Sequence, residues 1–153
     1  MDRGYESYNL MAHFQEKGWL YLICIRDGKQ SMCSSFNLPN TECFDQTFSL
    51  TLSRKQTKQF KKRYRDFPND YHFIPHNSTF DFLPETSRKH DPVELYQLPF
   101  RMVRLEVEKG KYETLVTNTG YSVQELKNLY ASRWGIETSF RDLKYSIRLV
   151  NFH

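Results

Sequence analysis

A long helical pattern near the C-terminus, from Ser122 to about Arg148, constrains the fold more than any other stretch. At about 100° per residue, one stripe roughly 60° wide carries a phenol, two cations and a carboxylate. These are Tyr130, Arg133, Glu137 and Lys144. The adjacent stripe is apolar, and we expect it to face the core; it holds Leu129, Ile136, Phe140, Leu143 and Ile147. The polar stripe suits contact with a phosphate backbone, since Arg and Lys bind phosphates.

The residues before this helix predict a β-hairpin. Alternation of apolar and charged residues from Val103 to Val107 is typical of a half-buried strand. The pair Lys109-Gly110 supplies a turn, and Tyr112 to Thr117 returns as a second strand. Ser122 and Glu125 then form an S-x-x-E capping box, which marks the start of the helix.

The N-terminal segment predicts a helix followed by a strand. Apolar residues recur at helical spacing between Tyr5 and Lys17, and Gly18 ends that pattern. The continuous apolar run from Trp19 to Ile25 indicates a strand buried on both faces, bounded by a turn at residues 26–28. A helix and a buried strand indicate part of an α/β layer.

The middle of the chain, from about Lys29 to Leu98, predicts short strands and turns. Within it, Arg54 to Arg65 holds seven Lys or Arg and no acid, with Phe60 and Tyr64 at i,i+4 spacing. A short amphipathic helix fits this segment. Two interpretations stay open: its cations form a solvated face, or some of them follow a DNA backbone, with Lys61, Lys62 and Arg63 as the candidates.

Composition sets wider limits. The length of 153 residues is typical of a single domain, and the net charge of +4 favours an anionic partner. Three scattered cysteines favour reduced thiols in the cytoplasm. The longest apolar run has seven residues, too few to span a bilayer. A zinc site is a poor fit, because Pro75 interrupts the histidine pair and the cysteine spacing is long; its four candidates are Cys33, Cys43, His72 and His76.

The spacing Tyr-x2-Arg-x3-Glu-x6-Lys, within LYASRWGIETSFRDLK, resembles the signature of the DDE transposases of the bacterial insertion-sequence-four class. The opening Asp2-Arg3-Gly4-Tyr5 is similar to the same family's second acidic motif. The resemblance therefore covers both ends of the chain, and it is most specific at the C-terminal one.

This resemblance implies a ribonuclease-H-like core of α/β class, here a partial one made of helix, strand and long C-terminal helix. A mostly β insertion interrupts this core. The core then consists of residues 1–28 and 98–153, and the insertion of residues 29–97. Asp2 and Glu137 become the second and third metal-binding acids, holding two Mg²⁺ ions, with Mn²⁺ as a substitute. Tyr130, Arg133 and Lys144 become contacts to DNA.

The implied function is metal-dependent cleavage and strand transfer in DNA transposition. The partners are then the transposon's terminal inverted repeats, target DNA and a second copy in a synaptic dimer. No membrane is involved, and the location is the bacterial cytoplasm, on the nucleoid when DNA is bound.

The sequence also departs from the family, because the first acid is missing and Asp2 follows only Met1. We therefore expect an N-terminally truncated copy that neither nicks nor joins DNA alone, which a strand-transfer assay with Mg²⁺ or Mn²⁺ would check. The alternative is a catalytically dead DNA-binding remnant that occupies transposon ends or pairs with a full-length transposase. A basic β-rich binding module unrelated to transposition would require the helical signature to be a coincidence.

Overall fold

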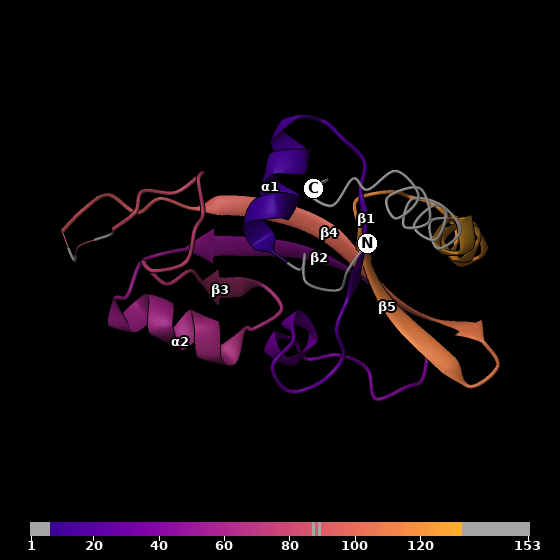
Figure 1. Cartoon of the computed structure of the whole chain (residues 1–153). Helices are drawn as coiled ribbons and strands as arrows, with labels where there is room; N and C mark the ends of the chain where they lie inside the picture. Colours follow the sequence, from indigo (N-terminus) through magenta and orange to yellow (C-terminus); the bar gives the residue numbers. More distant parts are fainter. Residues whose placement is uncertain (1–6, 87, 89, 133–153) are drawn as a thin grey trace, which may run out of the picture.

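A single five-stranded sheet organises the computed structural model, which describes residues 7–86, 88 and 90–132 (Figure 1). The strands lie in the order β1-β5-β4-β2-β3. Along the chain the elements are α1 (Tyr8–Glu16), β1 (Leu22–Ile25), the short 3-10 helix η1 (Met32–Ser35), β2 (Phe44–Ser53), α2 (Lys58–Asp66), β3 (Tyr71–Phe73), β4 (Tyr96–Glu108) and β5 (Lys111–Thr117). A further helix covers residues 123–132.

The sheet is mixed, because β2 and β3 run parallel while the other neighbouring strands are antiparallel. The α/β class predicted from the sequence is confirmed. The long strand β4 is shared: one edge pairs with β2 and the other with β5. Strands from the two predicted segments, 29–97 and the rest, therefore belong to one sheet. The boundaries of those segments stay a prediction.

The predicted hairpin is confirmed as β4 and β5. Gly110 has a φ of 78°, a left-handed conformation that glycine adopts without steric cost, so it suits the turn. A register shift between Glu106 and Glu108 marks a bulge beside that turn. Strand β4 begins at Tyr96, earlier than the alternation from Val103 indicates.

Alternate residues of the strands feed two separate cores. Met102 and Val116 belong to the larger cluster, together with Met11 and Ala12 of α1, which therefore packs against that face of the sheet. Val103 and Leu115, their neighbours in sequence, belong to a smaller cluster on the other face.

The smaller cluster also contains Leu126, which is fully buried, and Tyr130 packs against it. The helix over residues 123–132 thus turns the Leu126–Tyr130 side toward the sheet. Leu129 is 43% exposed. The prediction that the stripe beginning at Leu129 faces the core is wrong at this residue. The physical reason is that Leu126 and Tyr130, one turn apart, share the face over Leu115.

The N-terminal prediction holds for α1 but only partly for the strand that follows. Ser7 caps α1 by accepting a bond from the Leu10 amide, and Gly18 ends it with a φ of 68°. Trp19 and Leu20 lie outside β1 and are 55% and 66% exposed, so the expected burial of these two residues is wrong. The cause is that the Trp19 amide bonds to the Phe14 carbonyl, in the turn that closes α1.

Helix α2 confirms the amphipathic helix predicted within the basic segment. Thr57 caps it by accepting a bond from the Phe60 amide, and the Phe60 side chain is buried. None of the helices in the described parts of the chain is both long and apolar enough to cross a bilayer.

Candidate nucleic-acid interface

Tyr130 is the one member of the predicted DDE signature that lies within the described residues. It is half-buried, and it packs against the cluster of Cys24, Val103, Leu105, Leu115 and Leu126. The other four predicted site residues of this group lie outside the described residues: Asp2, Arg133, Glu137 and Lys144. The structure therefore gives the origin and the orientation of the signature helix, up to residue 132.

A reciprocal pair of hydrogen bonds fixes the first turn of this helix. The Glu125 amide donates to Ser122 Oγ at 3.1 Å, and the Ser122 amide donates to Glu125 Oε2 at 2.8 Å. This is the predicted capping box, and it is confirmed. It satisfies two amides that would otherwise lack partners at the helix start.

Two further side chains hold the link between β5 and the helix. Asn118 accepts from the Tyr21 amide at 2.9 Å and donates to the Trp19 carbonyl at 2.9 Å. Arg101 donates to the Tyr121 carbonyl, one residue before the cap. The link is therefore tied at one end to the chain entering β1 and at the other to β4. Neither positioning residue could be predicted from the sequence, since the partners of both are distant in the chain.

A buried carboxylate lies on the same face of the sheet as Tyr130. Glu113 of β5 is 9% exposed and accepts a hydrogen bond from Cys24 Sγ at 3.3 Å. Cys24 belongs to the cluster against which Tyr130 packs. The face that carries the signature helix is thus apolar with an acidic group at its side.

The three candidate DNA contacts of α2 differ in their availability. Lys61 and Lys62 are exposed on α2. Arg63 is half-buried, with its guanidinium carbon 4.9 Å from the centre of the Phe60 ring and 5.5 Å from that of Tyr71. Arg63 is therefore partly occupied in holding α2 against β3. The charged side chains of Lys61 and Lys62 are exposed to solvent, so these two residues remain the stronger candidates for contacts to DNA.

Two cations of the basic segment have a structural role instead. Arg54 and Lys55 are 5% and 2% exposed, so neither reaches a DNA backbone. The Arg54 guanidinium donates to the carbonyls of Pro75, Ser78 and Phe80. Lys55 Nζ donates to the carbonyls of Arg88 and Asp91, at 2.6 Å each. These bonds organise the loop between β3 and β4.

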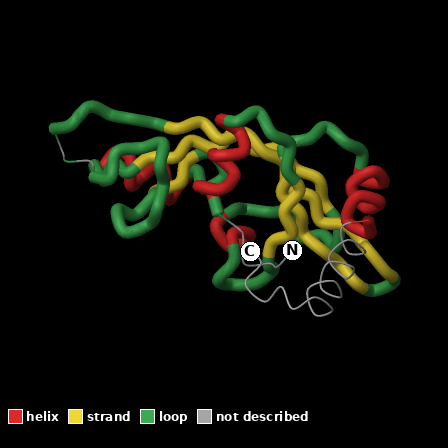
Figure 2. Tube along the Cα trace, turned by 45° about the horizontal axis from the view of Figure 1, so that its top comes forward, coloured by secondary structure: helices red, strands yellow, loops and turns green. Residues whose placement is uncertain are grey.

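The structure does not bring all the predicted DNA contacts together. Figures 1 and 2 show α2 at one end of the sheet and the helix over residues 123–132 at the other. The cations of α2 and Tyr130 are therefore two separate surfaces, not one patch.

The four residues considered as zinc ligands are not clustered in the structure either. Across residues 7–86, 88 and 90–132, no group of three or more His, Cys, Asp or Glu side chains is arranged to hold a metal ion. His72 instead lies among hydrogen-bond partners, with Nδ1 2.8 Å from the Tyr8 hydroxyl and Nε2 2.5 Å from the Pro68 carbonyl. Because Nε2 donates to a carbonyl, Nδ1 accepts from Tyr8.

These features define an α/β domain that carries Tyr130 on a capped helix and exposed cations on α2. A family model described as a transposase DDE domain matches residues 1–153, and the chain belongs to this family. Comparison with curated proteins finds no match, and comparison with solved structures finds none either. Members of this family are transposases that act on DNA and generally use divalent metal ions.

Proposed function

We propose that this chain takes part in the metal-dependent cleavage and strand transfer of DNA transposition, as part of a catalytic domain of the insertion-sequence-four class. The observation that carries the proposal is the family match over residues 1–153, combined with the spacing of Tyr130, Arg133, Glu137 and Lys144. The helix that begins this spacing is capped and tied to the sheet, which suits a residue set that has to be held in place.

Asp2 and Glu137 are the proposed metal ligands. Both offer hard carboxylate oxygens, which is the donor type that Mg²⁺ and Mn²⁺ prefer, so the donor set fits these ions. A bound Mg²⁺ pair would supply charge stabilisation at the phosphodiester. The chain's own part would be to present Glu137 from the predicted continuation of the helix, whose start is held by Arg101 and Asn118.

The proposed contacts to DNA fall on two surfaces. Tyr130, Arg133 and Lys144 would hold the transposon end beside the metal ligands. Lys61 and Lys62 would bind phosphates at the other end of the sheet, with Arg63 holding α2 in place. The partners are then terminal inverted repeats, target DNA and a second copy in a synaptic dimer. In this assignment residues 29–97 are the insertion between two parts of a ribonuclease-H-like core.

A second candidate is DNA binding without chemistry, in which the chain occupies transposon ends or pairs with a full-length transposase. The exposed cations of α2 favour it, because phosphate binding by Lys61 and Lys62 needs no metal. The two candidates differ in one property, a metal site formed by Asp2 and Glu137.

Iron-directed cleavage of the polypeptide tests that property without requiring turnover. Fe²⁺ with ascorbate and peroxide generates radicals that cut the chain near a site that binds Mg²⁺. We expect cuts near residues 2 and 137, which Mg²⁺ suppresses and Glu137→Gln abolishes. The matched control Glu108→Gln, on the exposed end of β4, should leave the cuts unchanged. Cleavage that Mg²⁺ does not suppress would leave DNA binding alone as the function.

Binding of duplex DNA at a series of salt concentrations tests the α2 surface. Each lost phosphate contact lowers the slope of log K against log salt by about 0.9. We expect Lys61→Gln with Lys62→Gln to lower the slope by roughly 1.8. Lys29→Gln with Lys109→Gln makes the same change in net charge on exposed turns. An equal effect of this control pair would show that net charge, not α2, governs binding.

A further inference from the structure

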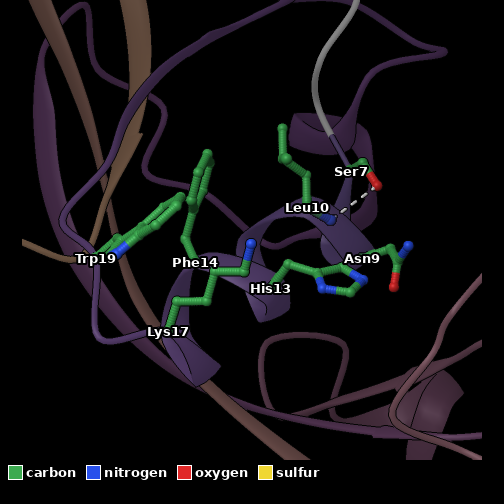
Figure 3. A pocket seen from close by; sticks show the side chains of 7 residues that line it. All are labelled: Ser7, Asn9, Leu10, His13, Phe14, Lys17 and Trp19. Atoms are coloured by element: carbon green, nitrogen blue, oxygen red, sulfur yellow. Dashed lines mark hydrogen bonds between the residues drawn. The ribbon is translucent and has the colours of Figure 1, made fainter.

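A pocket of about 480 Å³ runs along α1, outside both proposed DNA surfaces. Seven side chains line it: Ser7, Asn9, Leu10, His13, Phe14, Lys17 and Trp19. Figure 3 shows two aromatic rings, Phe14 and Trp19, with Lys17 at one end, and Asn9 and His13 at the other. The two ends therefore differ in chemistry, one aromatic and cationic, the other polar.

Trp19 combines an exposed side chain with a fixed backbone. The residue is 55% exposed, although large apolar side chains are usually removed from water. Its amide donates to the Phe14 carbonyl at 2.9 Å, and its carbonyl accepts from Asn118 at 2.9 Å. The ring is thus presented from an anchored main chain, not from a loose loop.

The aromatic end is supported from behind. The centre of the Phe14 ring lies 6.2 Å from that of Trp19. The Phe14 ring also stacks on the buried Tyr21, with 5.7 Å between the ring centres. Lys17 Nζ lies 4.6 Å from the centre of the Trp19 ring. An aromatic face backed by a second ring and accompanied by a flexible cation is the combination that single-stranded nucleic acid uses for stacking and phosphate contact.

The polar end lies beside an acidic side chain. His13 Nε2 lies 2.6 Å from Asp81 Oδ2, and Asn9 donates to the same oxygen at 3.2 Å. The pKa of Asp81 is lowered, chiefly by the hydrogen bond from His13. The Asp81 carboxylate therefore disfavours a phosphate near Asn9, whereas the Lys17 ammonium attracts an anion.

We propose that this pocket binds an unpaired nucleotide of the DNA substrate, with its base stacked on Trp19 and its phosphate on Lys17. The proposal rests on the proposed action on DNA, and adds an unpaired nucleotide as a ligand and α1 as a third contact surface. Only a base freed from its partner and neighbours offers a face to the indole, so duplex DNA does not fill the site. Stacking displaces the Lys17 ammonium, which is favourable since a stacked base is held more strongly than an exposed ammonium.

Tryptophan fluorescence tests the proposal directly, because the chain has two tryptophans, Trp19 and Trp134. In a Trp134→Phe variant all tryptophan emission comes from Trp19. We expect a single-stranded thymidine 12-mer to quench this emission and a duplex of equal length to leave it nearly unchanged. Where Trp134→Phe fails to fold, the difference in emission between the unsubstituted chain and Trp19→Phe gives the same measurement.

Affinities separate this proposal from the proposed function. Trp19→Ala should weaken single-strand binding about 10-fold, within the range that loss of one stacking ring produces, and leave duplex binding unchanged. Leu20→Ala, at a neighbour that is 66% exposed, should change neither. If neither single strand nor duplex is bound, the proposed action on DNA fails, and this proposal fails with it. Duplex binding together with a single strand that does not quench Trp19 overturns the pocket alone. Failure of iodide to quench Trp19 without DNA would also overturn it, since the indole would then be covered.

Discussion

Arg101 holds Asp45 by two parallel hydrogen bonds, Nε to Oδ1 and Nη2 to Oδ2, each 2.7 Å long. The pair joins neighbouring strands, since Asp45 lies on β2 and Arg101 on β4. The same guanidinium donates from Nη1 to the Tyr121 carbonyl, so one side chain connects β2, β4 and the start of the signature helix. The bond from Arg101 lowers the pKa of Asp45.

Replacing either member of this pair should destabilise the fold. A fork-shaped guanidinium binds a carboxylate at two points, whereas an ammonium does not, so Arg101→Lys is not a conservative change. Because Asp45 is 41% exposed, solvent screening limits the coupling to about 1 kcal/mol in a double-mutant cycle with Asp45→Asn. Urea unfolding measures it.

The pH dependence of the unfolding free energy provides a second test of the Arg101–Asp45 pair. Because the pKa of Asp45 is lowered below 3.8 in the folded state, its contribution is present above that value and is lost as the pH falls through the folded pKa. Asp45→Asn should therefore flatten the stability profile below about pH 4. An unchanged profile would mean that the pair does not form in solution.

Leu126 and Leu129 offer a matched comparison of the two sides of the signature helix. Leu126 is fully buried and Leu129 is 43% exposed. Leu126→Ala should cost about 2–5 kcal/mol of unfolding free energy, as expected for a buried leucine. Leu129→Ala should cost less than about 0.5 kcal/mol. Urea denaturation of both variants measures the difference, and a larger loss at Leu129 would restore the apolar stripe as the core side.

His72 should make stability fall in mildly acidic solution. Burial lowers the pKa of His72 from 6.5, against the opposing effect of hydrogen bonds to the carbonyls of Pro68 and Ser35. The neutral ring is then favoured on folding, so its contribution is complete above 6.5 and declines as the pH falls toward the folded pKa. Thermal unfolding between pH 7 and pH 5 should show this decline, and His72→Gln should reduce it. His76→Gln, at an exposed position, should leave it unchanged.

Lys55 should stabilise the loop between β3 and β4 without contributing to DNA affinity. Lys55→Met leaves the carbonyls of Arg88 and Asp91 without this donor, at a cost of about 1–3 kcal/mol. Trypsin should then cut after Arg88 faster, as mass spectrometry of early fragments would show. Lys58→Met, on an exposed position of α2, is the control. A lower salt slope for DNA binding in Lys55→Met would contradict the buried position.

Local patterns predicted the local structure well. The hairpin of β4 and β5, the cap formed by Ser122 and Glu125, and α2 follow from alternation, turn chemistry and spacing over a few residues. Each depends on neighbours in the chain, so the sequence contains the necessary information.

Side-chain burial was harder to predict, because it depends on partners far along the chain. Arg54 and Lys55 are basic residues of the same segment as Lys61 and Lys62, yet they are buried because they bond to carbonyls 21 to 36 residues away. Trp19 belongs to the same apolar run as Ile23, yet the turn after α1 leaves it in solvent. Leu126 lies on the core side because of Leu115 and Val103, which no helical period specifies.

The shared strand β4 has a consequence for cooperativity. Its hydrogen-bonded partners lie on both edges, from Phe44 to Leu52 on β2 and from Lys111 to Thr117 on β5. Neither neighbour can separate from β4 without breaking a ladder of main-chain bonds. Along Arg101 to Arg104, where β4 pairs with both neighbours, successive amides point to opposite edges, so full protection of this stretch from exchange with water requires both ladders. Strand β2, which lies within residues 29–97, therefore supports β4, the strand that carries Arg101 and pairs with the β5 strand leading to the signature helix.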